Sequence, residues 1–195
     1  MKRWVLIAAA VFAANAAFFQ WRTGDGPDGA GLSDLRAAPI GFKAPDAPLQ
    51  TDDGRILGLS DWRGQVAVVA LWATWCPICR HEMPQLDKLA SGWAEHGIAI
   101  LPISLDRHPR SLDLIQDWYR RHEIITLPVL HDKDGRFAGT VTATATPTTL
   151  IIDRSGAVVA SVVGRTDWAD PAIGDYLIAL VQAKDTEAAR ALLSR

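Results

Sequence analysis

Cysteine is scarce in this sequence, which has only two among its 195 residues. Two thiols are too few for the disulfide framework that stabilises small secreted domains, so the chain must fold around an apolar core. Its length and 49% hydrophobic content suit one globular domain with appendages. An excess of charge is also lacking. The 20 basic and 22 acidic residues leave a net charge of −2, which argues against a nucleic-acid partner.

The N-terminus has the pattern of an export signal. Lys2 and Arg3 precede an uncharged run from Trp4 to Trp21. Such a pattern keeps the N-terminus in the cytoplasm and sends the following chain across the membrane. About 18 apolar residues are enough to span a bilayer, so we predict an uncleaved signal-anchor at residues 1–21. Cleavage at Ala14-Asn15-Ala16, which would leave a soluble periplasmic protein, is the alternative.

The rest of the chain divides into a linker and a domain. Residues 22–38 are rich in glycine and aspartate and have little apolar surface, which predicts a flexible linker. The folded domain is expected to occupy residues 39–195. With or without cleavage, it would lie on the periplasmic side of the inner membrane, where disulfides persist.

Buried strands alternate with helices along the predicted domain. Continuous apolar runs and turn signals predict strands at residues 65–71, 98–105, 126–130, 148–152 and 157–163. Apolar residues at helical spacing predict helices at residues 76–90 and 111–122, and a C-terminal helix capped by Asp170 with Pro171 in its first turn. Asp53-Gly54 is typical of a hairpin turn. We therefore expect an α/β fold, with a mixed central β-sheet covered by helices on both faces.

Both cysteines lie in Trp75-Cys76-Pro77-Ile78-Cys79, at the predicted start of a helix. A disulfide across four residues closes almost no loop and adds little stability, so the spacing favours redox chemistry. With Cys76 as the predicted N-cap and Pro77 as the first helical residue, unpaired backbone N–H groups and the helix dipole favour the Cys76 thiolate. Cys76 is therefore expected to attack, and Cys79, one turn deeper, to resolve the mixed disulfide.

A metal site is not predicted. Zinc would need two ligands beyond the cysteines, and no histidine is suitably placed in the sequence. A copper metallochaperone that holds Cu(I) between the two thiolates stays an alternative, although it should need a further soft or imidazole ligand.

Several motifs together resemble the thioredoxin superfamily. They are Trp72-Ala73-Thr74-Trp75-Cys76-Pro77-Ile78-Cys79-Arg80, Glu82-Met83-Pro84, Thr146-Pro147-Thr148-Thr149 and Ile152-Asp153. The chain is most similar to the exported, membrane-tethered TlpA/ResA/CcmG branch, over roughly residues 40–182. The resemblance implies a thioredoxin fold.

The resemblance also implies roles for individual residues. Pro84 would kink the helix that follows the cysteines. Thr146 and Pro147 would form a cis peptide bond that faces the disulfide and exposes backbone to a substrate strand. Trp75 and Pro77, beside the cysteines, would contact the substrate.

Two further positions bear on proton transfer. Ala70 stands where cytoplasmic thioredoxins bury an aspartate. Glu82 matches the glutamate of the CxxCxxE pattern of the ResA/CcmG-like branch, which implies that it tunes the cysteines. We hypothesise that Glu82 accepts or relays the proton when Cys79 becomes a nucleophile. The alternative is an exposed glutamate that only complements the helix dipole.

The resemblance implies an extracytoplasmic thiol–disulfide oxidoreductase with no cofactor beyond the Cys76–Cys79 disulfide. It further implies a reductant, which takes electrons from a membrane dithiol donor similar to DsbD or CcdA. Its targets would be cysteines of apocytochrome c or of copper-site assembly proteins. The motif does not fix a reduction potential, so a disulfide oxidant and a copper-stress thiol protein similar to ScsD stay alternatives. A pure binding module is a third class of function.

Overall fold

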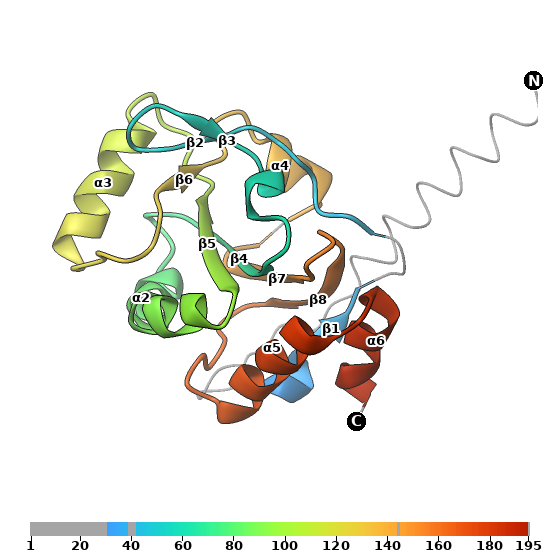
Figure 1. The fold of residues 1–195 in the computed structure, drawn as a ribbon. Coiled ribbons are helices and arrows are strands. Elements are labelled where there is room, and N and C mark those ends of the chain that lie inside the picture. Colours follow the sequence, from blue (N-terminus) through green and yellow to red (C-terminus); the bar gives the residue numbers. More distant parts are fainter. Residues whose placement is uncertain (1–30, 39–41, 144, 195) are drawn as a thin grey trace, which may run out of the picture.

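An eight-stranded mixed sheet forms the centre of the protein, in the order β1-β8-β7-β4-β5-β6-β2-β3 (Figure 1). The structure is a computed structural model that describes residues 31–38, 42–143 and 145–194. Its strands are β1 (Arg36–Ala37), β2 (Leu49–Gln50), β3 (Ile56–Leu57), β4 (Val66–Trp72), β5 (Ile98–Ser104), β6 (Leu130–His131), β7 (Thr148–Ile152) and β8 (Val158–Val163). Its helices are η1 (Leu32–Asp34), η2 (Leu59–Trp62), α2 (Cys79–Glu95), α3 (Ser111–Arg121), α4 (Arg136–Thr140), α5 (Pro171–Gln182), α6 (Thr186–Ala191) and η3 (Leu192–Ser194).

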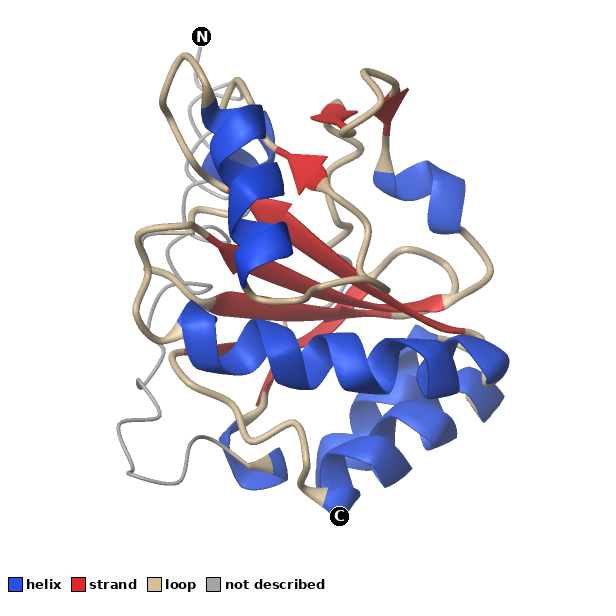
Figure 2. Ribbon diagram, turned by 90° about the vertical axis from the view of Figure 1, so that its left-hand side faces the viewer, coloured by secondary structure: helices blue, strands red, loops and turns tan. Residues whose placement is uncertain are grey.

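Helices cover both faces of the sheet, and Figure 2 shows them above and below the strands. One core contains Met83 of α2, Ile115 of α3 and Leu177 of α5. The other contains Leu59 of η2 and Phe137 of α4. All seven residues of β4 are buried because side chains from its two faces enter different cores. The predicted mixed α/β fold is confirmed.

The three central parallel strands define the edge at which the cysteines lie. β4 is parallel to β5, and β5 is parallel to β6. Their carboxyl ends therefore meet at one edge of the sheet, which we call the carboxyl edge. Three connections start there: residues 73–78 lead into α2, residues 105–110 into α3 and residues 132–135 into α4.

Most predicted elements agree with the structure to within one or two residues. Strand β7 has the predicted bounds, and α3 ends one residue earlier than expected. Asp53-Gly54 does form the turn between antiparallel β2 and β3, with Gly54 in the left-handed region at φ +85°. The Asp170 side chain caps α5 by accepting the backbone N–H of Ala172 at 2.9 Å.

The predicted strand at residues 126–130 is wrong, because only Leu130–His131 is a strand. The reason lies in α2, where the buried carboxylate of Asp87 accepts the backbone N–H groups of Ile125, Thr126 and Leu127 at 2.8 to 3.3 Å. Pro128 follows and has no N–H to donate. The backbone donors of this segment therefore bind a side chain instead of a neighbouring strand.

The ordered domain begins earlier than the predicted boundary at residue 39. Arg36–Ala37 forms β1 and pairs with β8, and Leu35 and Ala38 are buried. These two apolar side chains give residues 31–38 a core contact that the composition of the predicted linker concealed. Residues 22–30 of that linker and the predicted signal-anchor at 1–21 lie outside the described residues. Within the described part of the chain, no helix has the length and apolar character needed to cross a membrane.

Candidate active site

A disulfide joins Cys76 and Cys79, whose Cα atoms are 5.4 Å apart. The backbone N–H of Cys79 donates to the Cys76 sulfur at 3.1 Å, and the backbone N–H of Cys76 donates to Ala73 at 3.1 Å. Cys79 is 1% exposed and Cys76 is 4% exposed. The order of shielding is as predicted, although both residues are buried.

The helix starts later than the sequence predicted. It begins at Cys79 with Ile78 as N-cap, so the prediction of Cys76 as N-cap is wrong. Pro77 and Ile78 form a separate turn, and His81 donates to Ile78 at 3.0 Å, an i to i−3 bond that tightens the first turn. The expected electrostatic contact is still present, because the Cys76 sulfur faces a backbone N–H. A thiolate at this position would accept that hydrogen bond more strongly than a thiol does.

The residues next to the buried cysteines expose apolar side chains to solvent. Trp75 is 66% exposed, Ile78 is 39% exposed and Pro77 is exposed. Large exposed apolar side chains are costly unless a partner covers them, and three close neighbours of the disulfide form such a surface. The positions of Trp75 and Pro77 suit the predicted contact with substrate.

A buried carboxylate that the sequence analysis missed holds the cysteine loop. Asp106, which follows β5, accepts the backbone N–H of Thr74 at 3.0 Å and its hydroxyl at 2.6 Å. It also accepts the hydroxyl of Ser104 at 2.7 Å. Since β4 and β5 are parallel neighbours, a polar residue directly after β5 lies beside the loop that follows β4. Its position at the end of the apolar run 98–105 was the signal that could have identified it.

Asp106 also connects the loop to β6. Its carbonyl oxygen accepts a hydrogen bond from His131 Nε2 at 3.0 Å. His131 Nδ1 is buried and has no hydrogen-bond partner among the described residues. Next to it, the buried Asp132 carboxylate lies 3.5 Å from Nη2 of Arg107. These contacts fix the three connections of the carboxyl edge relative to one another.

Glu82 is buried rather than exposed, so the exposed-glutamate alternative is wrong. One carboxylate oxygen accepts the backbone N–H of Thr166 at 2.5 Å. Burial raises the pKa of Glu82 from 4.5 to about 7, against the opposing effects of the Thr166 N–H, the Trp168 indole and the Arg165 charge. The Trp168 N–H acts as a nearby donor, although it makes no hydrogen bond of regular geometry. Because Glu82 lies one turn beyond Cys79, a carboxyl group that titrates near neutral pH stands close to the disulfide.

The remaining predicted positions lie around the same part of the sheet. Ala70 is buried in β4 between Pro102 and Thr149, so that strand carries no acid at this place. Pro84 lies inside α2, as predicted. The Thr146–Pro147 bond is cis, also as predicted, with Pro147 buried and Thr146 half-buried. It directly precedes β7, whose first residue pairs with the end of β4. The roles of these residues stay predictions.

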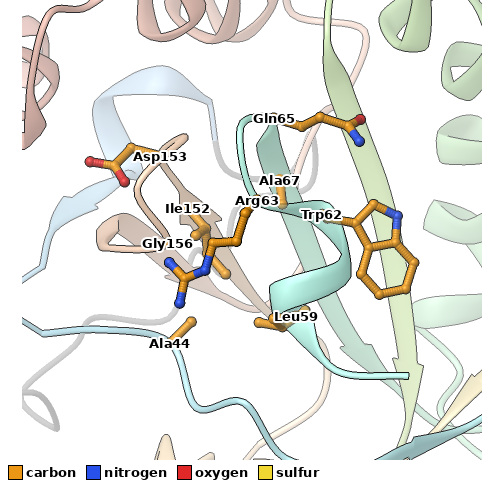
Figure 3. A pocket seen from close by; sticks show the side chains of 9 residues that line it. All are labelled: Ala44, Leu59, Trp62, Arg63, Gln65, Ala67, Ile152, Asp153 and Gly156. Atoms are coloured by element: carbon orange, nitrogen blue, oxygen red, sulfur yellow. The ribbon is translucent and has the colours of Figure 1, made fainter. Parts of the chain in front are cut away.

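Four cavities among the described residues contain none of the predicted site residues in their linings. In the described ranges, no three histidine, cysteine or acidic side chains are grouped to hold a metal ion. A small enclosed cavity lies between η2 and the turn of the β7–β8 hairpin (Figure 3). Its volume of about 10 Å³ is room for about one water molecule. No predicted site residue lines it, so it is not a candidate for substrate binding.

Known proteins are similar to this chain in sequence and in fold. A model of the AhpC/TSA family matches residues 40–161. The thiol–disulfide oxidoreductase ResA of Bacillus cereus is 27% identical over 134 residues, which are 69% of this chain and 75% of ResA.

Two solved structures match this chain over nearly their own whole length. A protein of Chlorobium tepidum assigned as the thiol:disulfide interchange protein DsbE matches with a TM-score of 0.63 and 26% identity, over 72% of this chain and 96% of its own. The exposed lipoprotein thioredoxin Etrx1 of Streptococcus pneumoniae matches with a TM-score of 0.59 and 28% identity, over 68% and 98% of the two chains. The family match, the thioredoxin fold and the Cys76–Cys79 disulfide agree: the chain belongs to the AhpC/TSA family and is a thiol–disulfide oxidoreductase of the ResA/DsbE type.

Proposed function

We propose that this oxidoreductase is a reductant that acts on the periplasmic side of the inner membrane. Its substrates would be disulfides of apocytochrome c or of proteins that assemble copper sites. A membrane dithiol donor similar to DsbD or CcdA would restore its reduced state. The observation that supports this most directly is a disulfide at a helix N-terminus with a buried carboxyl group, of pKa about 7, one turn away.

The proposed reaction has two exchanges. The Cys76 thiolate attacks one sulfur of the substrate disulfide, forms a mixed disulfide and releases the other substrate sulfur as a thiolate, which takes up a proton. The Cys79 thiol then loses its proton and attacks the Cys76 sulfur, which releases the second substrate thiolate. The substrate gains two electrons and two protons, and the protein ends with the Cys76–Cys79 disulfide.

Glu82 is the proposed acceptor of the Cys79 proton. A general base acts best when its pKa lies near the working pH, and the pKa of Glu82 is raised to about 7. The alanine at position 70 leaves β4 without an acid that would serve the same purpose. Replacement of Glu82 by glutamine should therefore change the pKa values of the cysteines and the reduction potential. If both stay as in the parent protein, Glu82 has no such role.

The substrate would bind across the exposed surface of the loop. Trp75 and Pro77 provide apolar contacts beside the disulfide, and the backbone at Thr146 and Pro147 would pair with an extended substrate segment. Residues 1–21 would anchor the protein in the membrane. Residues 22–30 would form the tether, because residues 31–38 pack on the domain.

Trapping of the mixed disulfide tests this function. A Cys79→Ser variant retains the attacking thiol but cannot resolve, so it should accumulate its partners on Cys76. Mass spectrometry of the trapped species should identify a membrane dithiol protein and an apocytochrome or a copper-site protein. The Cys76→Ser, Cys79→Ser double variant is the control and should trap neither.

The other outcomes distinguish the alternatives. A trapped donor that is an oxidant of exported proteins would contradict the reductant assignment. If no thiol protein is trapped and the wild-type protein binds Cu(I), the metallochaperone alternative replaces it.

A further inference from the structure

We propose that the carboxyl edge is a cationic docking surface for protein partners whose reactive cysteines are flanked by acidic residues. This inference rests on the proposed function, because it concerns how a disulfide substrate is recognised. It adds a class of substrate sequence that the disulfide itself does not specify.

The evidence begins with the charges of the three connections at this edge. Exposed cations follow each of the three parallel strands; they are Arg80 after β4, Arg107 and Arg110 after β5, and Lys133 and Arg136 after β6. Neighbouring strands lie about 4.8 Å apart, so the three connections start within about 10 Å of one another. The exposed His81 and His108 lie in the same connections.

The acids of these connections do not neutralise the cations from outside. Glu82, Asp106 and Asp132 are buried, and each accepts hydrogen bonds from within the protein. Asp132 is also paired with Arg107, whose side chain is still 45% exposed. Among residues 73–82, 105–113 and 132–136, all of which the structure describes, the exposed carboxylates are Asp113 and Asp134. With Arg107 set aside because Asp132 pairs with it, the exposed side carries four cationic groups, Arg80, Arg110, Lys133 and Arg136, against two acidic ones.

Helix dipoles strengthen this field. The N-termini of α2 and α3 carry partial positive charge, and acidic side chains usually occupy the first turn of a helix. At α2 the first turn holds exposed Arg80 and His81, while its acid, Glu82, is buried. At α3 the N-cap is Arg110, although the exposed Asp113 lies in the first turn. Cations at these positions oppose the local helix preference, which is expected if they serve an external anion.

The apolar and charged parts of the surface come from different residues of the same edge. Trp75, Pro77 and Ile78 adjoin the disulfide, and the cations lie beyond them. A complementary segment would place apolar side chains next to its cysteines and aspartate or glutamate further out. Such charge complementarity raises association rates and discriminates between partners more than it raises affinity. We assign the surface to a protein partner rather than to anionic lipid because it lies at the same edge of the sheet as the reacting sulfurs.

The test uses the full-length protein, reduced and held in detergent, with a matched series of peptides. Each peptide has the same intramolecular disulfide, and the residues outside the cysteines are all acidic, all neutral or all basic. The rate of peptide reduction is measured by acid quenching and mass spectrometry of the thiols. At low salt we expect the acidic peptide to react about 10-fold faster than the basic one, and the ratio to fall towards one as salt screens the charges.

Paired charge variants locate the effect. The triple variant Arg80→Gln, Arg110→Gln, Arg136→Gln should lower the ratio of acidic to basic rates by about 5-fold or more at low salt. A change in the intrinsic reactivity of the cysteines would alter both rates equally and leave the ratio unchanged. The control triple variant Lys88→Gln, Arg154→Gln, Lys184→Gln removes the same charge from other exposed positions and should keep the parent ratio; Arg154, for example, follows β7 at the opposite edge of the sheet.

Each contrary result has a distinct meaning. A parent ratio near one, or equal losses in the two triple variants, would overturn the docking surface while leaving the reductant function intact. If none of the peptides is reduced, the proposed function fails instead. If the ratio is near one and the edge variant binds vesicles with anionic lipid more weakly than the control variant does, the cations face a membrane and the proposal is wrong.

Discussion

Glu82 and Asp87 lie on the same helix, five residues apart, and both are almost fully buried, yet their carboxylates have very different surroundings. Glu82 is 4% exposed and accepts one backbone N–H, from Thr166. Asp87 is 7% exposed and accepts the backbone N–H groups of three successive residues, 125–127. Burial alone therefore does not distinguish them; the number of donors does.

The difference assigns the two acids to different tasks. A carboxylate that exchanges water for a single backbone donor is poorly solvated, and the pKa of Glu82 is accordingly raised to about 7. That makes Glu82 suitable for proton exchange beside Cys79. Asp87 instead organises the chain between α3 and β6, and in doing so replaces the strand that the sequence predicted. One helix thus carries a redox end, at Glu82, and a structural acid in its middle, Asp87.

At neutral pH the largest loss of stability is expected from removal of the structural acid, Asp87. In an Asp87→Ala variant the N–H groups of Ile125, Thr126 and Leu127 lose their acceptor. Water can reach the first two, but the Leu127 group is buried. We expect the free energy of unfolding to fall by about 3 kcal/mol, measured by urea denaturation with tryptophan fluorescence.

An Asp87→Asn variant distinguishes the loss of a hydrogen-bond acceptor from the loss of the negative charge. Asp87→Asn retains one acceptor oxygen and should lose less than half as much stability as Asp87→Ala. An alanine variant within about 1 kcal/mol of the parent would show that the three hydrogen bonds do not organise this segment.

At the redox end the prediction concerns pH. The folded-state pKa of Glu82 is about 7 and its ordinary value is 4.5, so the folded protein binds the proton more tightly than the unfolded chain does. Between these two pH values the unfolded state binds fewer protons, and the Glu82 contribution to stability declines as the pH rises. The difference corresponds to about 3 kcal/mol, which is present below pH 4.5 and lost above pH 7.

A Glu82→Gln variant removes this titration. Measured by urea denaturation across pH 4 to about 8, the parent should lose stability over the predicted window and the variant should lose about 3 kcal/mol less. Identical pH profiles would mean that folding does not shift the pKa of Glu82, and the contrast with Asp87 would lose its basis.

The same contrast explains what the sequence could and could not predict. Strands β4, β5 and β7 were predictable because a strand buried on both faces needs a continuous apolar run. Cys76, Cys79, Pro84 and the cis bond before Pro147 followed from short motifs. These are all features whose cause is contained in a few neighbouring residues.

Features that depend on distant partners could not be predicted in this way. The donor to Glu82 is Thr166, 84 residues away, so the sequence left both a proton-relaying and a merely exposed glutamate open. The segment 126–130 has strand composition, but an acid 39 residues earlier satisfies its backbone. Asp106 became recognisable only once β4 and β5 were known to be parallel neighbours.

The smallest predicted effect tests whether the donor count around Glu82 sets its pKa. The indole N–H of Trp168 lowers the pKa of Glu82 from nearby, and the ring is 2% exposed. A Trp168→Phe variant removes that donor and retains most of the packing, so the pKa of Glu82 should rise above about 7. The stability decline should then extend to higher pH, by less than the whole Glu82→Gln effect.

The matched control is Trp93→Phe. The Trp93 ring packs edge-on against Trp168, with 6.4 Å between ring centroids, but Trp93 is not among the groups that shift the pKa of Glu82. This variant should lower stability equally at every pH. If Trp168→Phe does the same, the indole acts on Glu82 only through packing. The backbone N–H of Thr166 would then be the main donor that distinguishes Glu82 from a carboxylate with no hydrogen bond at all.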